Sequence, residues 1–234
     1  MNNFHCNSSM PRSGSELLQA LLAQHPDIYA SATSPLLEFW YGAMSNYNLP
    51  EVKSQNPIAM KKAFNEFCKF SGKGYYESLT ERPVVVDKSR GWIEYAEFLW
   101  NVYPDAKIIC MTRDVEAIVK SLEAIYRINP MHPDCRNLPK TPQLRHNYWV
   151  SSGSLPLGLS IERIKSRKAK GADSRIKYVD YSELCGNPIK IMNSIFDHLE
   201  VAPYKIDPNN IIKSVEEDDS HYGVFGNHKL KSKI

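Results

Sequence analysis

The sequence lacks the features that mark membrane, secreted and nucleic-acid-binding proteins. No apolar run approaches the roughly 18 residues of a membrane-spanning helix, and the opening "MNNFHCNSS" has no basic segment followed by an apolar one. Five cysteines are scattered without a CxxC spacing, which argues against a zinc site or a disulfide framework. The formal net charge of +3 is too small to indicate a nucleic acid or membrane partner. We therefore expect a cytoplasmic globular protein.

The residues that are present suffice for one folded domain. The chain has 234 residues, of which 42% are hydrophobic, enough to bury a sizeable core. Short β-branched or aromatic runs are each followed by an amphipathic segment, a pattern typical of parallel sheets. These runs are "FHCNSS", "PVVVD", "KIICMT" and "RIKYVDY". The pattern predicts an α/β fold of three layers, similar to P-loop proteins, with a central parallel sheet flanked by helices.

Two segments interrupt this regular pattern. Residues 34–72 contain two predicted helices, each beginning with a polar cap and a proline, at Ser34-Pro35 and at Asn56-Pro57. Residues 127–145 are rich in proline and too broken for a long helix. Long loops of this kind are often functional. We interpret the first segment as a helical insertion and the second as a loop-rich segment within a single domain covering residues 1–234.

The motif "PRSGS", residues 11–15, follows the first predicted strand and begins a helix. A helix N-terminus presents unpaired N–H groups and a partial positive charge, so this turn is suited to an anion. Gly14 lets the backbone amides turn inward, and Arg12 adds a forked donor for phosphate or sulfate oxygens. The nucleotide triphosphatase motif GxxxxGK is absent here, and "SGKG" at Ser71 follows no predicted strand. The anion is therefore expected to bind without the lysine used for ATP.

Three motifs in order resemble the sulfotransferases that use 3'-phosphoadenosine 5'-phosphosulfate (PAPS). "PRSGS" with "LLQALLAQHPDI" resembles their 5'-phosphosulfate loop. "KIICMTRDVEAIVKSLE" resembles their 3'-phosphate segment, with Arg113 and Ser121 at the matching spacing. "YVDYSELCGNPIKIMNSIFDHLEV" resembles their strand, corner and helix, with Tyr181 at the corner. The resemblance covers residues 4–201 and extends more weakly to the tail "EEDDSHYGVFGNHKL".

The resemblance implies PAPS as sulfuryl donor, with no metal ion required. Its binding residues are expected to be Arg12, Ser13, Gly14, Ser15, Glu16, Arg113, Ser121, Tyr181 and Lys229. Transfer would be an in-line displacement in which positioning and charge stabilisation do most of the work. Arg12 is also expected to stabilise charge on the bridging oxygen. Glu16 is expected to face outward, because an inward acid would repel the bound anion.

Catalytic roles follow less directly from the resemblance. Lys88, just after "VVVD", resembles the lysine near the transferring sulfuryl group, best known in tyrosylprotein sulfotransferases. Those relatives carry a glutamate base where this chain has Thr33, and threonine is a poor base at neutral pH. Glu38, the nearest carboxylate, is therefore predicted to be the base. Asp87 and His146 remain alternatives.

The leading hypothesis is an enzyme that transfers a sulfuryl group to a hydroxyl acceptor, which is a small molecule, a saccharide or a peptide tyrosine. Residues 34–72 and 127–145 are expected to form the acceptor pocket, with Phe39, Trp40 and Tyr41 as an apolar wall beside Glu38. A non-catalytic nucleotide-binding protein would keep the anion site and lack the base. A P-loop nucleotide kinase is a third alternative and would require the missing lysine. The sequence does not indicate an oligomeric state.

Overall fold

A parallel β-sheet forms the centre of the protein in the computed structural model, which describes residues 1, 3–213, 215, 217–226 and 232–234. The described strands are β1 (Asn3–Asn7), β2 (Ile28–Thr33), β3 (Val84–Lys88), β4 (Ile108–Thr112) and β5 (Ile176–Asp180). They lie in the order β2-β3-β1-β4-β5, and each neighbouring pair is parallel. The expected α/β fold with a parallel sheet is confirmed.

Strand β2 was absent from the runs that the sequence predicted as strands. Its sequence "IYASAT" contains small and polar residues in place of a β-branched run, because β2 lies at the edge of the sheet and is only partly buried. Its pairing with β3 is also irregular between Ala30 and Thr33. The carboxyl end of β2 nevertheless lies directly beside the end of β3, so that Thr33 is next to Lys88.

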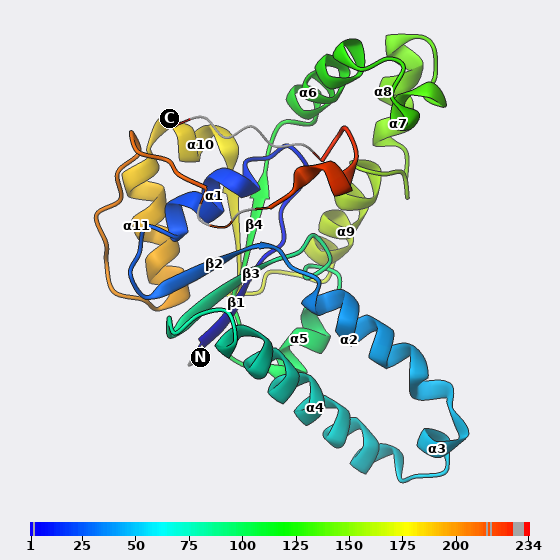
Figure 1. The fold of residues 1–234 in the computed structure, drawn as a ribbon, viewed down its shortest axis with the longest axis vertical. Helices are drawn as coiled ribbons and strands as arrows, with labels where there is room; N and C mark the ends of the chain where they lie inside the picture. Colours follow the sequence, from blue (N-terminus) through cyan, green and yellow to red (C-terminus); the bar gives the residue numbers. More distant parts are fainter. Residues whose placement is uncertain (2, 214, 216, 227–231) are drawn as a thin grey trace.

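Helices cover both faces of the sheet (Figure 1). On one face, α1 (Ser15–Leu22), α10 (Tyr181–Gly186) and α11 (Pro188–Leu199) pack against Val84 and Val86. On the other, α2 (Leu36–Ser45), α4 (Pro57–Glu77) and α5 (Ala96–Val102) pack around Val85. Side chains alternate between faces along a strand. Lys88 therefore lies on the α1 side of β3, and Asp87 on the α4 side.

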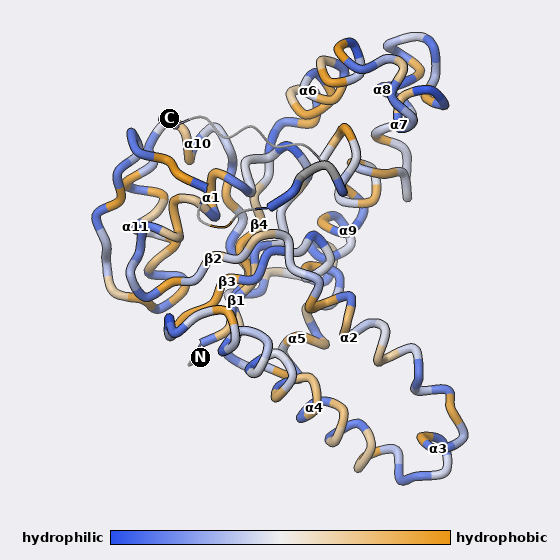
Figure 2. Tube along the Cα trace, viewed as in Figure 1, coloured by the Kyte–Doolittle hydropathy of each residue, from blue (hydrophilic) through white to orange (hydrophobic). Residues whose placement is uncertain are grey.

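The segment between β2 and β3 is a helical arm that extends away from the sheet (Figure 1). It contains α2, the 3-10 turn η1 (Asn46–Asn48), α3 (Pro50–Lys53) and α4. Asn56 caps α4 by accepting hydrogen bonds from the next two free N–H groups, as its position before a proline predicts. Hydrophobic and hydrophilic residues alternate along α2 and α4 (Figure 2), as expected for helices with one face on the core. The "SGKG" string lies inside α4, far from any phosphate-binding turn.

The remaining helices lie beyond β4. They are α6 (Val115–Ile128), the short α7 (Pro133–Arg136), α8 (Pro142–Val150) and α9 (Gly158–Ala169), followed after α11 by the 3-10 turn η2 (Asp219–Tyr222) in the tail. A third apolar cluster, which includes Met10, Ile118 and Trp149, joins them to the sheet. In the described part of the chain, no helix is long and apolar enough to cross a membrane.

Candidate active site

The turn between β1 and α1 has the backbone geometry of an anion-binding loop. Arg12 and Gly14 both adopt left-handed conformations, with φ of 56° and 91°, and such turns direct backbone N–H groups toward one point. A Cβ atom at Gly14 would lie 2.5 Å from a ring carbon of Tyr181, so both the conformation and the close approach require glycine. Gly14 caps α1 without a side-chain hydrogen bond, which leaves the first N–H groups of the helix to a ligand or to water.

Two serines of the loop have different surroundings. The Ser13 side chain is fully buried, and its hydroxyl donates to the carbonyl of Met10 at 2.6 Å and also lies 3.2 Å from the carbonyl of Met111. Ser13 thus fixes the loop against β4, and its backbone N–H is the group left to contact a ligand. Ser15 is partly exposed and lines a cavity that opens beside the loop.

Four residues predicted to bind the nucleotide lie together, although they come from different elements. Arg12 Nε donates to Ser121 Oγ at 3.2 Å, which joins the loop to α6. Arg113, at the end of β4, donates to the Arg12 carbonyl at 2.9 Å and stacks over the Tyr181 ring at 4.4 Å. Burial lowers the pKa of Arg12, and repulsion from Arg113 lowers it further. Two neighbouring guanidinium groups would be stabilised by a bound anion.

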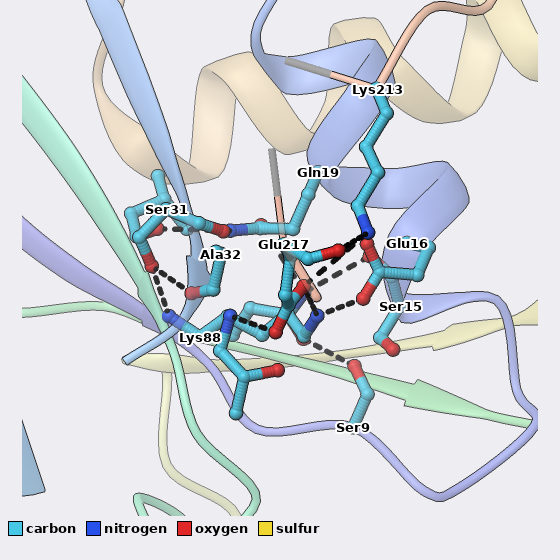
Figure 3. Close-up of polar contacts among 12 residues, drawn as sticks. Ser9, Ser15, Glu16, Gln19, Ser31, Ala32, Lys88, Lys213 and Glu217 are labelled. Atoms are coloured by element: carbon cyan, nitrogen blue, oxygen red, sulfur yellow. Dashed lines mark hydrogen bonds and ion pairs between the residues drawn. The ribbon is translucent and has the colours of Figure 1, made fainter. Parts of the chain in front are cut away.

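Lys88 lies between two carboxylates at the end of β3 (Figure 3). Its ammonium forms a close ion pair with Glu16 Oε1 and lies 3.8 Å from Glu217 Oε2. The expectation that Glu16 faces outward is therefore wrong, because its side chain is only 11% exposed and points at Lys88. The Lys88 ammonium compensates for the cost of burying the Glu16 carboxylate near the anion site. The sequence around Glu16 does not indicate this pairing.

Glu217 belongs to the tail and was not predicted as a site residue. Its Oε1 accepts a hydrogen bond from the Thr33 backbone N–H at 3.1 Å. Burial alone would raise the pKa of Glu217, but attraction to Lys88 and hydrogen bonds from Thr33 and Tyr222 outweigh it, and the pKa is lowered. Glu217 is therefore ionised at neutral pH. Its position in an acidic stretch of the tail gives no sequence signal for this contact.

A cavity of about 530 Å³ opens beside the loop and Lys88. Its wall near the sheet includes Ser9, Ser15, Thr33, Lys88 and Arg90, and its outer wall includes Glu38, Tyr41, Tyr95, Pro156, Arg163, Tyr222 and Phe225. The outer wall thus combines aromatic rings with charged groups of both signs. Of the site residues that the sequence predicted, Ser15, Glu38 and Lys88 line this cavity.

Comparison with known proteins identifies the family. The sequence matches the model of the sulfotransferase family over residues 8–205. The chain belongs to this family. No curated protein matches the sequence.

Solved sulfotransferase structures share the fold at low sequence identity. The sulfotransferase domain of the Synechococcus PCC 7002 olefin synthase is 22% identical, with a TM-score of 0.52 over 88% of this chain and 78% of that domain. The sulfotransferase domain from the curacin biosynthetic pathway is 20% identical, with a TM-score of 0.53 and the same coverage. A sulfotransferase from Alicyclobacillus acidocaldarius is 16% identical, with a TM-score of 0.53 over 94% of this chain and 87% of that one. These structures show a shared fold, and the family match over residues 8–205 gives sulfuryl transfer as the reaction class of this protein.

In this sulfotransferase, two of the predicted alternative bases lie away from the cavity wall. Asp87 is fully buried, where its carboxylate accepts hydrogen bonds from Tyr76 and from Trp92 Nε1. Burial raises the pKa of Asp87, and its partners belong to the core on the α4 side of the sheet. His146 contacts Glu116 at 2.8 Å, and it lines a separate groove between α6 and α8.

The predicted acceptor wall needs two further corrections. Of the three aromatic residues beside Glu38, only Tyr41 lines the cavity. Trp40 is buried in the core, because its side of α2 faces α4 and α5, and Phe39 is 60% exposed and packs on Tyr75. Residues 127–145 do not line the cavity, since the tail and the segment near α9 occupy that side of it.

The two remaining predictions for this sulfotransferase concern Lys229 and metal ions. Lys229, predicted to contact the nucleotide, lies outside the described residues. Among the described residues, no group of three or more His, Cys, Asp or Glu side chains is arranged to hold a metal ion.

Proposed function

We propose that this sulfotransferase moves the sulfuryl group of PAPS to a hydroxyl acceptor. The observation that carries the proposal is the cluster of Arg12, Arg113 and Ser121 beside the left-handed turn of the loop. PAPS has two separate anionic ends, a 5'-phosphosulfate and a 3'-phosphate. The loop and Arg12 suit the first end, and Arg113 with Ser121 suits the second. Tyr181, stacked on Arg113, holds that guanidinium in place.

The transfer requires few protein groups. The acceptor oxygen forms a bond to sulfur while the bond between sulfur and the bridging oxygen breaks, and the electron pair leaves with the 5'-phosphate of the nucleotide. Arg12 and Lys88 stabilise the negative charge that develops on the transferring group and on the bridging oxygen. A carboxylate takes the acceptor proton. We assign this role to Glu38, because it lines the cavity that also contains Lys88.

The cavity favours a small acceptor. Its volume lies within the range of about 300–1,000 Å³ that is usual for small-molecule sites. Tyr41 and Tyr95 contact each other edge to face with ring centroids 5.9 Å apart, and Tyr222 and Phe225 complete an aromatic wall. Such walls bind flat apolar groups. Among the acceptor classes that the sequence left open, we therefore favour a small alcohol or phenol over a saccharide or a peptide tyrosine.

Nucleotide preference tests the proposal. The protein is expected to bind 3',5'-adenosine bisphosphate in the presence of a chelator, and more tightly than it binds Mg-ATP, because the loop has no lysine and we assign Arg113 to the 3'-phosphate. Isothermal titration calorimetry measures both affinities. Mg-ATP binding of equal or greater strength would overturn the donor assignment. Turnover of PAPS with a panel of small phenols and alcohols, followed by intact mass, separates an enzyme from a non-catalytic binding protein.

Arg113→Ala tests the 3'-phosphate site. The substitution is expected to weaken binding of 3',5'-adenosine bisphosphate by about 2–3 kcal/mol, or roughly 30- to 150-fold, the scale of a charge-assisted contact. Adenosine 5'-phosphosulfate, which lacks the 3'-phosphate, should lose much less affinity. Calorimetry with both ligands measures the difference. Equal losses would show that Arg113 acts only by supporting the Arg12 carbonyl.

A further inference from the structure

We infer that Glu217, a residue of the tail, is a positioning residue for sulfuryl transfer. Its carboxylate holds the Lys88 side chain in place between β2 and the anion-binding loop. The inference rests on the proposed function, since it assumes that Lys88 acts on the transferring group. It adds a residue outside the three ordered motifs, in the tail to which the resemblance extends only weakly, and outside residues 8–205, the part of the chain that matches the family model.

The contacts of Glu217 connect the ends of two neighbouring strands. One carboxylate oxygen accepts from the N–H of Thr33 at the end of β2, at 3.1 Å. The other lies 3.8 Å from the ammonium of Lys88 at the end of β3. Both side chains are largely buried, with exposures of 7% for Glu217 and 10% for Lys88. Figure 3 shows the two side chains facing each other beneath α1.

The two carboxylates near Lys88 have different environments. Glu16 lies in the first turn of α1, the position of the proposed anion site. A bound phosphosulfate repels the Glu16 carboxylate and competes with it for the same ammonium. Glu217 accepts a hydrogen bond from the Thr33 N–H at the end of β2. Because the strand order is β2-β3-β1, Glu217 lies on the side of Lys88 away from the loop that follows β1. Donor binding therefore displaces Glu16 and leaves Glu217 to hold Lys88.

The tail has other anchors besides Glu217. The N–H of Val224 donates to Asp134 Oδ2 at 2.8 Å, and the Phe225 ring packs edge to face on Trp149 with centroids 6.0 Å apart. Lys213 Nζ lies 3.8 Å from the same Glu217 oxygen that faces Lys88, so this contact depends on the carboxylate and is not one of these independent anchors. A neutral side chain at position 217 should therefore leave the tail in place, and a loss of turnover can be traced to Lys88.

A double-mutant cycle tests this role. Glu217→Gln is expected to lower kcat about tenfold, the effect of an interaction between paired residues, with little change in affinity for the bisphosphate. In a Lys88→Ala background the same substitution should have no further effect. Glu66→Gln, the same substitution at an exposed position of α4, is the matched control and should keep the wild-type kcat. Glu16→Gln should instead raise affinity for the bisphosphate, because it removes a negative charge from the anion site.

Additive losses in the cycle would overturn the inference, since Glu217 would then act independently of Lys88. A loss that persists without Lys88 and grows with the pKa of the acceptor would make Glu217 a base. Failure of the proposed function is a separate result, seen as a wild-type protein that neither binds the bisphosphate nor turns over PAPS. In that case, acetylation of Lys88 measured by peptide mass spectrometry still tests the contact. Labelling should be faster in Glu217→Gln and unchanged in Glu66→Gln, and equal labelling in the wild type and both variants would contradict it.

Discussion

Replacing Lys88 with alanine is expected to lower kcat by about two orders of magnitude or more while leaving affinity for 3',5'-adenosine bisphosphate almost unchanged. The bisphosphate lacks the sulfuryl group, so an interaction with the transferring group contributes to the rate and little to the affinity for this product. Steady-state kinetics with saturating PAPS, together with calorimetry of the bisphosphate, measures the two effects. A variant that binds poorly yet turns over normally at saturation would place Lys88 in ground-state binding.

The surroundings of Lys88 require a control for stability. Removing its ammonium takes away the ion-pair partner of Glu16 and one of the two ammonium groups near Glu217, and a buried carboxylate that loses its cation destabilises a protein. The double variant Lys88→Ala with Glu16→Gln removes one charge of each sign and should recover part of the lost thermal stability. If the double variant melts like the wild type and kcat stays low, the loss of rate is a catalytic effect.

Glu38→Gln is expected to lower transfer to an alcohol of high pKa by about 100-fold or more, the contribution of a general base. Transfer to an acidic phenol should fall much less, because such an acceptor loses its proton with little assistance. Rates on the two acceptors, together with the affinity for the bisphosphate, measure the effect, and the affinity should not change. Glu51→Gln, on the exposed helix α3, is the matched control and should leave both rates unaltered.

Unchanged rates on both acceptors would remove Glu38 from the mechanism. Attention would then move to Glu217, whose carboxylate lies 3.8 Å from the Lys88 ammonium and accepts a hydrogen bond from the Thr33 N–H. Asp87 would not become the next candidate, since Tyr76 and Trp92 occupy both of its carboxylate oxygens inside the core. The same acceptor comparison, made with Glu217→Gln, would then test Glu217 as the base.

The nucleotide framework could be predicted because its residues lie at local junctions of strand and helix. Arg12 and Gly14 follow β1, Arg113 follows β4, and Tyr181 follows β5. In a parallel sheet the carboxyl ends of the strands meet at one edge, so residues far apart in sequence come together once the strands are known. The contacts of Arg12 with Ser121 and of Arg113 with Tyr181 agree with this expectation, while their roles toward PAPS stay predictions.

The surroundings of Lys88 could not be predicted in the same way. The contact between Lys88 and Glu16 joins residues 72 positions apart, and the contact between Thr33 and Glu217 joins residues 184 positions apart. Glu16 and Lys88 do lie at junctions of strand and helix, but no motif indicates which residues pair with each other. A helix-terminal glutamate alone favours an outward orientation, and only the position of the ammonium reverses it. The edge strand β2, which places Thr33, was missed for a related reason, since its burial depends on neighbours and not on its own composition.

The tail also determines when the site becomes complete during synthesis. Chains emerge from the ribosome from the N-terminal end, at roughly 5–20 residues per second, so β1, β2, β3 and the anion-binding loop are available long before Glu217. During that interval Lys88 has Glu16 as its partner in the structure described here, and the aromatic wall lacks Tyr222 and Phe225. Closing a contact across 184 residues is slow relative to local pairing. A nascent chain thus contains the residues of the anion-binding loop before it contains Tyr222 and Phe225 of the acceptor cavity.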